Sequence, residues 1–242
     1  MKALLLALAA CGTTGGDIVS FDVEATGTGV TAMDTGLGWH VELSRAHLQI
    51  GAVYLNLAVP ISGSQATTCI LPGIYTAEEL SSLDVDVLST DRQAFPDHAT
   101  GTTDEARTGE IWLTGGDVNA LTDSTVIADI AGTATRDTDI RPFTAQITIS
   151  NANRGIPASD PSLPSQHPIC KQRIVSPIPI DLRPREGATL LITVDAGSWF
   201  ANVDFTALPD DGVFPDTNDN VASQNLFTGI RAASASFQFS LE

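Results

Sequence analysis

The stretch from Gly38 to Leu57 (GWHVELSRAHLQIGAVYLNL) constrains the fold more than any other part of the chain. Apolar and polar residues alternate through it, as in a strand that buries one face. After Arg45 the alternation shifts by one residue, which predicts an inserted residue near Ser44 and Arg45, that is, a β-bulge. Two strands joined by a tight turn are the alternative. The apolar positions are Trp39, Val41 and Leu43 before the shift, and Ala46, Leu48 and Ile50 after it.

The end of this stretch, Ala52 to Leu57, is almost entirely apolar, which predicts a strand buried on both faces. Other alternating segments indicate that strands make up most of the chain. Turn-forming residues from Arg136 to Pro142 predict a hairpin between two of them. Pro177 and Pro179 predict that their strand lies at a sheet edge. The other strand segments begin near Val19, Ile111, Val126, Phe143, Ile174, Leu190 and Ala233.

One short helix is expected over Thr76 to Leu83, because Thr76 and Glu79 have the spacing of a capping box. The segments Asp84 to Thr108 and Asn151 to Pro168 are polar or rich in proline, and we expect long loops there. No strand–helix–strand rhythm or internal repeat occurs. The predicted fold is therefore all-β: an antiparallel β-sandwich, jelly-roll or immunoglobulin-like, with long loops and one short helix.

The N-terminus, MKALLLALAAC, has one Lys2 and an apolar run too short to span a bilayer, as in an export signal. Leu8, Ala9, Ala10 and Cys11 resemble the lipobox of bacterial lipoproteins. The resemblance implies cleavage before Cys11 and lipids on that residue, and two or more acyl chains would hold the protein stably at a membrane. Residues 1–10 would then be a signal peptide, residues 11–16 a lipidated tether and residues 17–242 a single β-sandwich domain.

The same resemblance implies an extracytoplasmic location, with the outer membrane favoured because Gly12 rather than aspartate follows the cysteine. Three cysteines are present, so lipidation of Cys11 leaves Cys69 and Cys170 as a pair in an oxidising compartment. We expect a disulfide between them. It would close a loop of about 100 residues, which in the chain-entropy model contributes roughly 4.7 kcal/mol. Two separate buried thiols are the alternative.

The charge balance excludes one class of partner. With 12 basic and 29 acidic residues the formal net charge is −17, which disfavours binding to nucleic acid. The segment DTNDN places Asp216, Asn218 and Asn220 at the first three ligand positions of a calcium loop. Asp210 or Asp211 would complete an irregular calcium site. The alternative is an acidic turn whose side chains bind nearby backbone amides.

Two of the four histidines, His40 and His47, lie on the polar side of the central strand, and the bulge would bring both onto one face. Imidazole is a common ligand of copper and zinc. Trp39 beside His40, the strand-rich pattern and the export signal resemble secreted bacterial copper-binding proteins of the MbnP and MopE type. That resemblance implies copper bound through histidines and an oxidised tryptophan. Two surface histidines on a solvated sheet face are the alternative.

Catalytic motifs are absent: the sequence has no G-x-S-x-G, S-x-x-K with K-T-G, H-E-x-x-H or P-loop. Trp112 shares its side of a strand with Glu110 and is the aromatic residue expected to be exposed for sugar binding. We therefore expect a lipid-anchored, extracytoplasmic β-sandwich with a non-catalytic binding or envelope-structural role, and an envelope protein is one candidate partner. A copper-binding protein using His40 and His47, and an envelope hydrolase without a recognisable motif, are the alternatives. The oligomeric state stays open.

Overall fold

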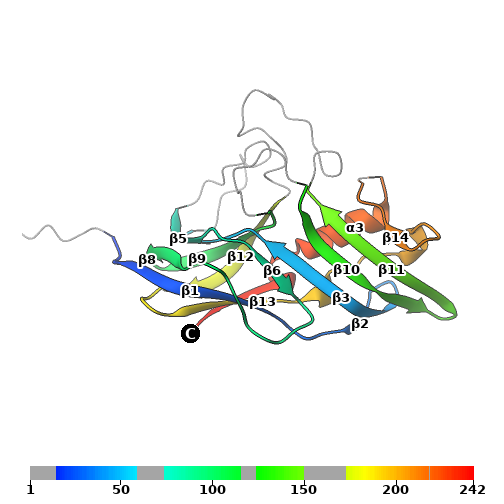
Figure 1. Ribbon diagram of the computed structural model, residues 1–242, viewed down its shortest axis with the longest axis horizontal. Helices are drawn as coiled ribbons and strands as arrows, with labels where there is room; N and C mark the ends of the chain where they lie inside the picture. The colour runs from blue at the N-terminus through cyan, green and yellow to red at the C-terminus, as the bar shows by residue number, and fades with distance from the viewer. Residues whose placement is uncertain (1–14, 59–73, 116–123, 150–172, 218) are drawn as a thin grey trace, which may run out of the picture.

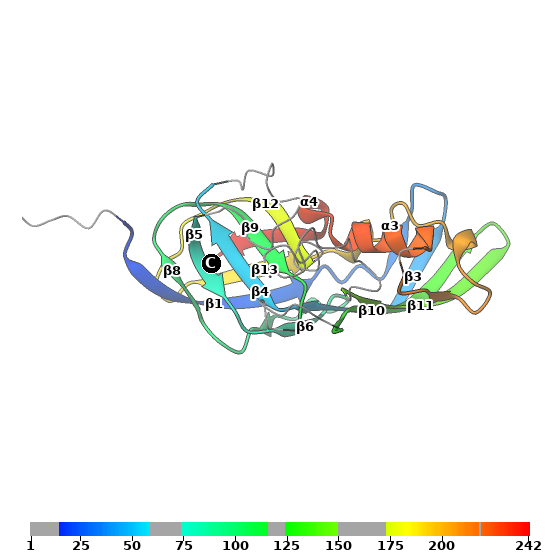
Figure 2. The same ribbon diagram turned by 90° about the horizontal axis from the view of Figure 1, so that it is seen from above.

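The chain folds into two β-sheets that share one hydrophobic core, as expected for an all-β, sandwich-like protein (Figures 1 and 2). The computed structural model describes residues 15–58, 74–115, 124–149, 173–217 and 219–242. Most strand pairs are antiparallel, and two pairs, β1 with β13 and β11 with β14, are parallel. The core draws on both sheets, since their inward-facing residues belong to a single buried cluster.

The larger sheet has nine strands, in the order β12-β9-β4-β5-β8-β1-β13-β15, with β7 also paired to β1. Its strand β12 carries Pro177 and Pro179 and lies at the end of the sheet, so the predicted edge strand is confirmed. In chain order the strands of this sheet are β1 (Ile18–Gly27), β4 (Ala52–Asn56), β5 (Tyr75–Glu79), β7 (Gln93–Ala94), β8 (Ala99–Thr102), β9 (Ala106–Trp112), β12 (Ile174–Leu182), β13 (Thr189–Val194) and β15 (Phe237–Leu241).

This larger sheet curls so that its last strand packs against its first strands (Figure 2). The contact depends on Gly109 of β9, because a Cβ atom added there would lie 2.4 Å from the ring of Phe239 on β15. Only a residue without a side chain allows the two strands to approach this closely.

The smaller sheet has six strands, in the order β14-β11-β10-β3-β2, with β6 also paired to β3. The predicted hairpin is confirmed: β10 and β11 are antiparallel neighbours, and Asp137 in their turn has a positive φ of 54°. In chain order these strands are β2 (Ala32–Asp34), β3 (His40–Ile50), β6 (Leu83–Asp86), β10 (Val126–Arg136), β11 (Asp139–Thr148) and β14 (Val213–Phe214).

The inner face of the six-stranded sheet is covered by the short helices, while its outer face is open (Figure 1). An aromatic cluster fills the space between sheet and helices, with ring centroids of Phe143 and Phe205 5.0 Å apart and those of Trp39 and Phe205 5.3 Å apart. The helices are η3 (Ala196–Ser198), η4 (Phe205–Ala207), α3 (Val221–Ile230) and α4 (Ala233–Ser236).

Strand β3 contains the predicted bulge. Arg45 pairs with Ala131 and Leu43 pairs with Gly132 on β10, so Ser44 is the extra residue. The insertion lets both halves of β3 bury their apolar side chains in the core. After Gly51 the chain passes into the other sheet as β4, whose five residues are all buried, as predicted for the end of this stretch.

Several predictions of secondary structure are wrong. The helix expected over Thr76 to Leu83 is instead strand β5, because Ala77 pairs with Leu55 on one side and Gly101 on the other, and the Thr76 hydroxyl donates to the Leu55 carbonyl. The long loop expected over Asp84 to Thr108 contains β6, β7, β8 and the start of β9. The strand expected from Ala233 begins only at Phe237, after α4, and helix α3 was not predicted.

Candidate binding site on the six-stranded sheet

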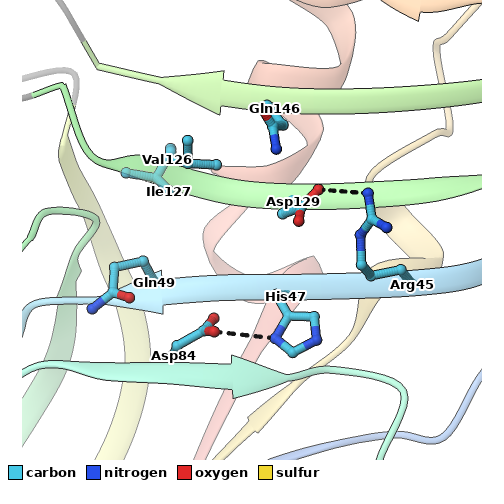
Figure 3. A pocket seen from close by; sticks show the side chains of 8 residues that line it. All are labelled: Arg45, His47, Gln49, Asp84, Val126, Ile127, Asp129 and Gln146. Atoms are coloured by element: carbon cyan, nitrogen blue, oxygen red, sulfur yellow. Dashed lines mark hydrogen bonds and ion pairs between the residues drawn. The ribbon is translucent and has the colours of Figure 1, made fainter.

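The outer face of the six-stranded sheet presents a polar surface to solvent. Side chains alternate between the two faces of a strand, and in β3 the bulge at Ser44 aligns Arg45, His47 and Gln49 on the outer face. Neighbouring strands contribute further polar groups beside them (Figure 3). These are Asp84 from β6, Asp129 from β10 and Gln146 from β11.

Two ion pairs organise this surface. The Arg45 guanidinium donates to Asp129 Oδ1 at 2.9 Å, and His47 Nδ1 lies 3.2 Å from Asp84 Oδ2 (Figure 3). The Arg45 guanidinium and the His47 imidazole thus each have an acidic partner on an adjacent strand. All four remain partly exposed, so solvent screens the pairs and they contribute little to stability.

The surface is hollowed in two adjoining places, which we call the polar groove. The first hollow, about 310 Å³, lies over β6, β3, β10 and β11, and the second, about 380 Å³, extends over β11 and β14. They meet at Arg45 and Gln146, which line both. The second hollow is otherwise lined by Thr144, Val213, Phe214, Pro215 and Asp216.

The first hollow is rich in hydrogen-bonding groups. Two amides, two carboxylates, a guanidinium and an imidazole offer both donors and acceptors. The groove can therefore hold a polar ligand in a defined orientation.

His40 and His47 share the outer face of β3 but are not brought together. Seven positions along a strand, less the bulge, separate them by roughly 20 Å. The His40 Nδ1 atom lies 2.8 Å from Asp34 Oδ1, and this hydrogen bond raises the pKa of His40. Trp39, which precedes it, is fully buried and donates its indole N–H to Asp204 at 3.4 Å.

Metal ligands do not cluster in the parts of the chain that the structure describes, where no group of three or more His, Cys, Asp or Glu side chains could hold a metal ion. In the predicted calcium segment, Asp216 accepts hydrogen bonds from the backbone and hydroxyl of Thr148. Asn220 caps α3, since its Oδ1 accepts from the Ser223 amide at 3.0 Å. Asp211 binds the Val213 amide, and Asn218 lies outside the described residues.

Trp112 is buried, so its expected exposure is wrong: only 7% of its surface is accessible. Its ring packs 5.4 Å from that of Tyr54, and the Tyr54 and Tyr75 rings are 4.7 Å apart. With Glu110 and Asn56 these residues form a second cluster, on the outer face of the nine-stranded sheet, which we call the Glu110 cluster.

Glu110 is the residue that sequence reasoning missed. It is fully buried, and burial raises its pKa to about 7, although its polar neighbours Trp112, Asn56 and Ser176 oppose the shift. Its position beside a tryptophan on the same face of β9 was visible in the sequence, but the pattern suggested an exposed pair.

The predicted lipid-bearing Cys11 and the cysteines of the predicted disulfide, Cys69 and Cys170, lie outside the described residues. Helix α3, with 10 residues, is the longest helix within the described ranges, and none there combines the length and apolar character needed to cross a bilayer. Comparison with known proteins finds no matching family model, curated protein or solved structure.

Proposed function

We propose that this protein is a non-catalytic binding protein of the bacterial cell envelope, anchored by lipid on Cys11, whose polar groove binds a neutral, hydroxyl-rich ligand such as a carbohydrate chain. The observation that carries the proposal is the solvent-facing groove, in whose first hollow Arg45 is paired with Asp129 and His47 with Asp84.

The internal pairing argues for a neutral ligand. A charged ligand group would have to separate Arg45 from Asp129 or His47 from Asp84 and leave one partner uncompensated. Sugar hydroxyls are both donors and acceptors, so they can bind such a pair without breaking it. The amides of Gln49 and Gln146 add further groups of both kinds.

The shape of the groove argues for an elongated ligand. Its two hollows adjoin at Arg45 and Gln146, and together they cross the sheet from β6 to β14. Pockets for small molecules bury most of the ligand surface. Here the four side chains of the two ion pairs remain partly exposed, which suits a chain that lies along the sheet with one side in water.

The predicted lipid anchor supports an envelope role. Residues 12–16 would tether the domain close to the membrane surface, within reach of envelope polysaccharides. The net charge of −17 also disfavours acidic polymers, which again favours a neutral glycan.

The test compares two variants of the full chain, solubilised in detergent. In Gln49→Ala/Gln146→Ala the groove loses two amides without exposing a charge, and in the control Gln238→Ala an exposed strand residue outside the groove is changed. By calorimetry we expect short neutral oligosaccharides to bind the native protein, and the double variant to bind about tenfold more weakly. Acidic oligosaccharides should bind less well.

Equal affinity in the double variant and the control would contradict the role of the groove. Absence of binding to any neutral oligosaccharide would contradict the ligand class.

A further inference from the structure

The Glu110 cluster lies on the outer face of the nine-stranded sheet, apart from the polar groove. Strand β9 contributes Glu110 and Trp112, whereas Ile111 between them points into the core. Strand β4 contributes Tyr54 and Asn56, because Val53 and Leu55 occupy the core-facing positions. The cluster therefore results from side-chain alternation in two paired strands.

One buried acceptor of the cluster has no hydrogen-bond partner. The Glu110 carboxylate accepts from Asn56 Nδ2 at 2.9 Å and from the Trp112 indole at 3.3 Å. The other polar atom of Asn56, Oδ1, is buried and has no hydrogen-bond partner. A carboxylate has about four lone-pair sites, so further donors can also bind at Glu110. Asn56 Oδ1 is thus a buried acceptor without a donor.

The surroundings are also negative and aromatic. The titratable groups that face Glu110 are Tyr54 on β4 and Tyr75 on β5, and the exposed Glu78 carboxylate on β5 acts on both tyrosines. Burial raises the pKa of both tyrosines, to about 12 for Tyr54, so their rings stay neutral at ordinary pH. Strand β12 adds Ser176, and no cation faces Glu110 among the described residues.

We infer that the Glu110 cluster is a binding site for a ligand that presents a primary ammonium group. Glu110 would be its counter-ion, Asn56 Oδ1 would accept one of its hydrogen bonds, and the rings of Tyr54 and Tyr75 would interact with its charge. An ammonium group carries three donors and one positive charge, so it could donate to Asn56 Oδ1 and compensate the Glu110 carboxylate. Aromatic rings within about 6 Å of such a group add cation–π attraction.

The approach to the site is marked by Tyr75, the member of the cluster that reaches solvent, with 40% of its surface accessible. Glu78, which acts on Tyr75, is also exposed, so the solvent-facing side of the cluster is acidic and aromatic. A metal ion is a poorer fit, because the described residues offer no third His, Cys, Asp or Glu side chain to coordinate it.

A proton competes with the ammonium group for Glu110. Protonated Glu110 is neutral and offers its own O–H as a donor, so it needs no cation. Because the pKa of Glu110 is raised to about 7, the carboxylate that attracts the ligand forms only as the pH rises through that value. Affinity should therefore increase from pH 6 to pH 8, where an alkylammonium ion stays charged.

The experiment uses the full chain and n-butylammonium, with n-butanol as its neutral analogue. The Trp112 indole N–H donates to Glu110 and serves as the reporter in a ¹⁵N NMR titration, with its signal assigned by Trp112→Phe. We expect n-butylammonium to shift this signal at millimolar concentration and n-butanol to leave it unchanged. Lowering the pH from 8 to 6 should weaken binding about tenfold.

Two variants complete the test. Glu110→Gln keeps the shape of the side chain and should lose binding about tenfold or more, while Glu105→Gln, a matched change near the start of β9, should bind as the native chain does. If Glu110→Gln fails to fold, the pH dependence of n-butylammonium binding to the native chain tests the inference instead. Equal affinity at pH 6 and pH 8, equal shifts with n-butanol, or no shift at all would overturn the inference.

Discussion

Glu110 has the environment with the clearest consequence for stability at the scale of single residues. A carboxyl group that is buried without a cationic partner favours its neutral form, because desolvation penalises the charge. The His40 imidazole is the opposite case: its Asp34 partner favours the charged form, but both groups are exposed, so the effect on stability is small.

Stability should therefore fall as the pH rises through the window set by Glu110. Its pKa is about 7 in the folded protein and near the ordinary value of 4.5 when unfolded, so the native state holds the extra proton between these values. The free energy of unfolding should decrease by about 3 kcal/mol from pH 4.5 to pH 7 because of this residue. Urea unfolding across the window measures it.

Glu110→Gln is the control for this pH dependence of the free energy of unfolding, because it removes the titrating group and keeps the side-chain shape. Its free energy of unfolding should depend much less on pH between 4.5 and 7. A variant with the same pH dependence as the native chain would show that other groups cause it.

Among the elements, helix α3 and strand β5 show how local signals and tertiary contacts compete. Asn220 Oδ1 accepts from the Ser223 amide in the first turn of α3, and its Nδ2 donates to the Ala207 carbonyl at 2.9 Å, so it fixes the helix to η4. Thr76 has the sequence of a helix cap, yet strand pairing on both sides determines its structure.

Replacing Asn220 tests whether this segment is a helix cap or a calcium loop. Asn220→Ala removes the cap hydrogen bond and should lower the free energy of unfolding by about 1 kcal/mol, equally with calcium and with a chelator. Thermal unfolding under both conditions measures this. A calcium-dependent melting temperature of the native chain that is lost in Asn220→Ala would instead favour the calcium site.

In the whole molecule, the two sheets share a core but differ in their outer faces. The six-stranded sheet exposes paired charges and amides, whereas the nine-stranded sheet bears the buried Glu110 cluster. The consecutive strands β3 and β4 differ in burial: β3 has one solvated face, whereas β4 is buried on both faces. The chain thus places two chemically distinct candidate sites on one core.

The envelope location is the whole-molecule prediction that the sequence makes most directly. If Cys11 carries the lipid, Cys11→Ser expressed in a diderm bacterium should move from the membrane fraction to the soluble fraction, because the acyl chains no longer hold it. Mass spectrometry of the N-terminal peptide shows whether Cys11 carries the lipid. An unmodified Cys11 in the native chain would contradict the lipid anchor, and with it the envelope part of the proposed function.

Much of the fold could be predicted because side-chain periodicity is a local property. The bulge in β3 follows from a shift in alternation around Ser44, and the β10–β11 hairpin from turn residues between two alternating strands. The short strands β6, β7 and β8 could not be predicted, because they have two to four residues and form only beside longer strands. The sequence predicted His47 on a polar face, but its partner Asp84 lies 37 residues further on, and Asp129, the partner of Arg45, lies 84 residues beyond that arginine.

By itself, the sequence determined the all-β class, the outward polar face of β3, the β-bulge and the edge strand with two prolines, since each depends on residues close together in the chain. Only the tertiary structure decided that Trp112 and Glu110 are buried, that Thr76 belongs to a strand, and that His40 and His47 lie far apart. Alternation tells which side chains share a face of a strand, but what covers that face depends on distant segments. Burial, pKa and the formation of a site are therefore properties of the packed molecule.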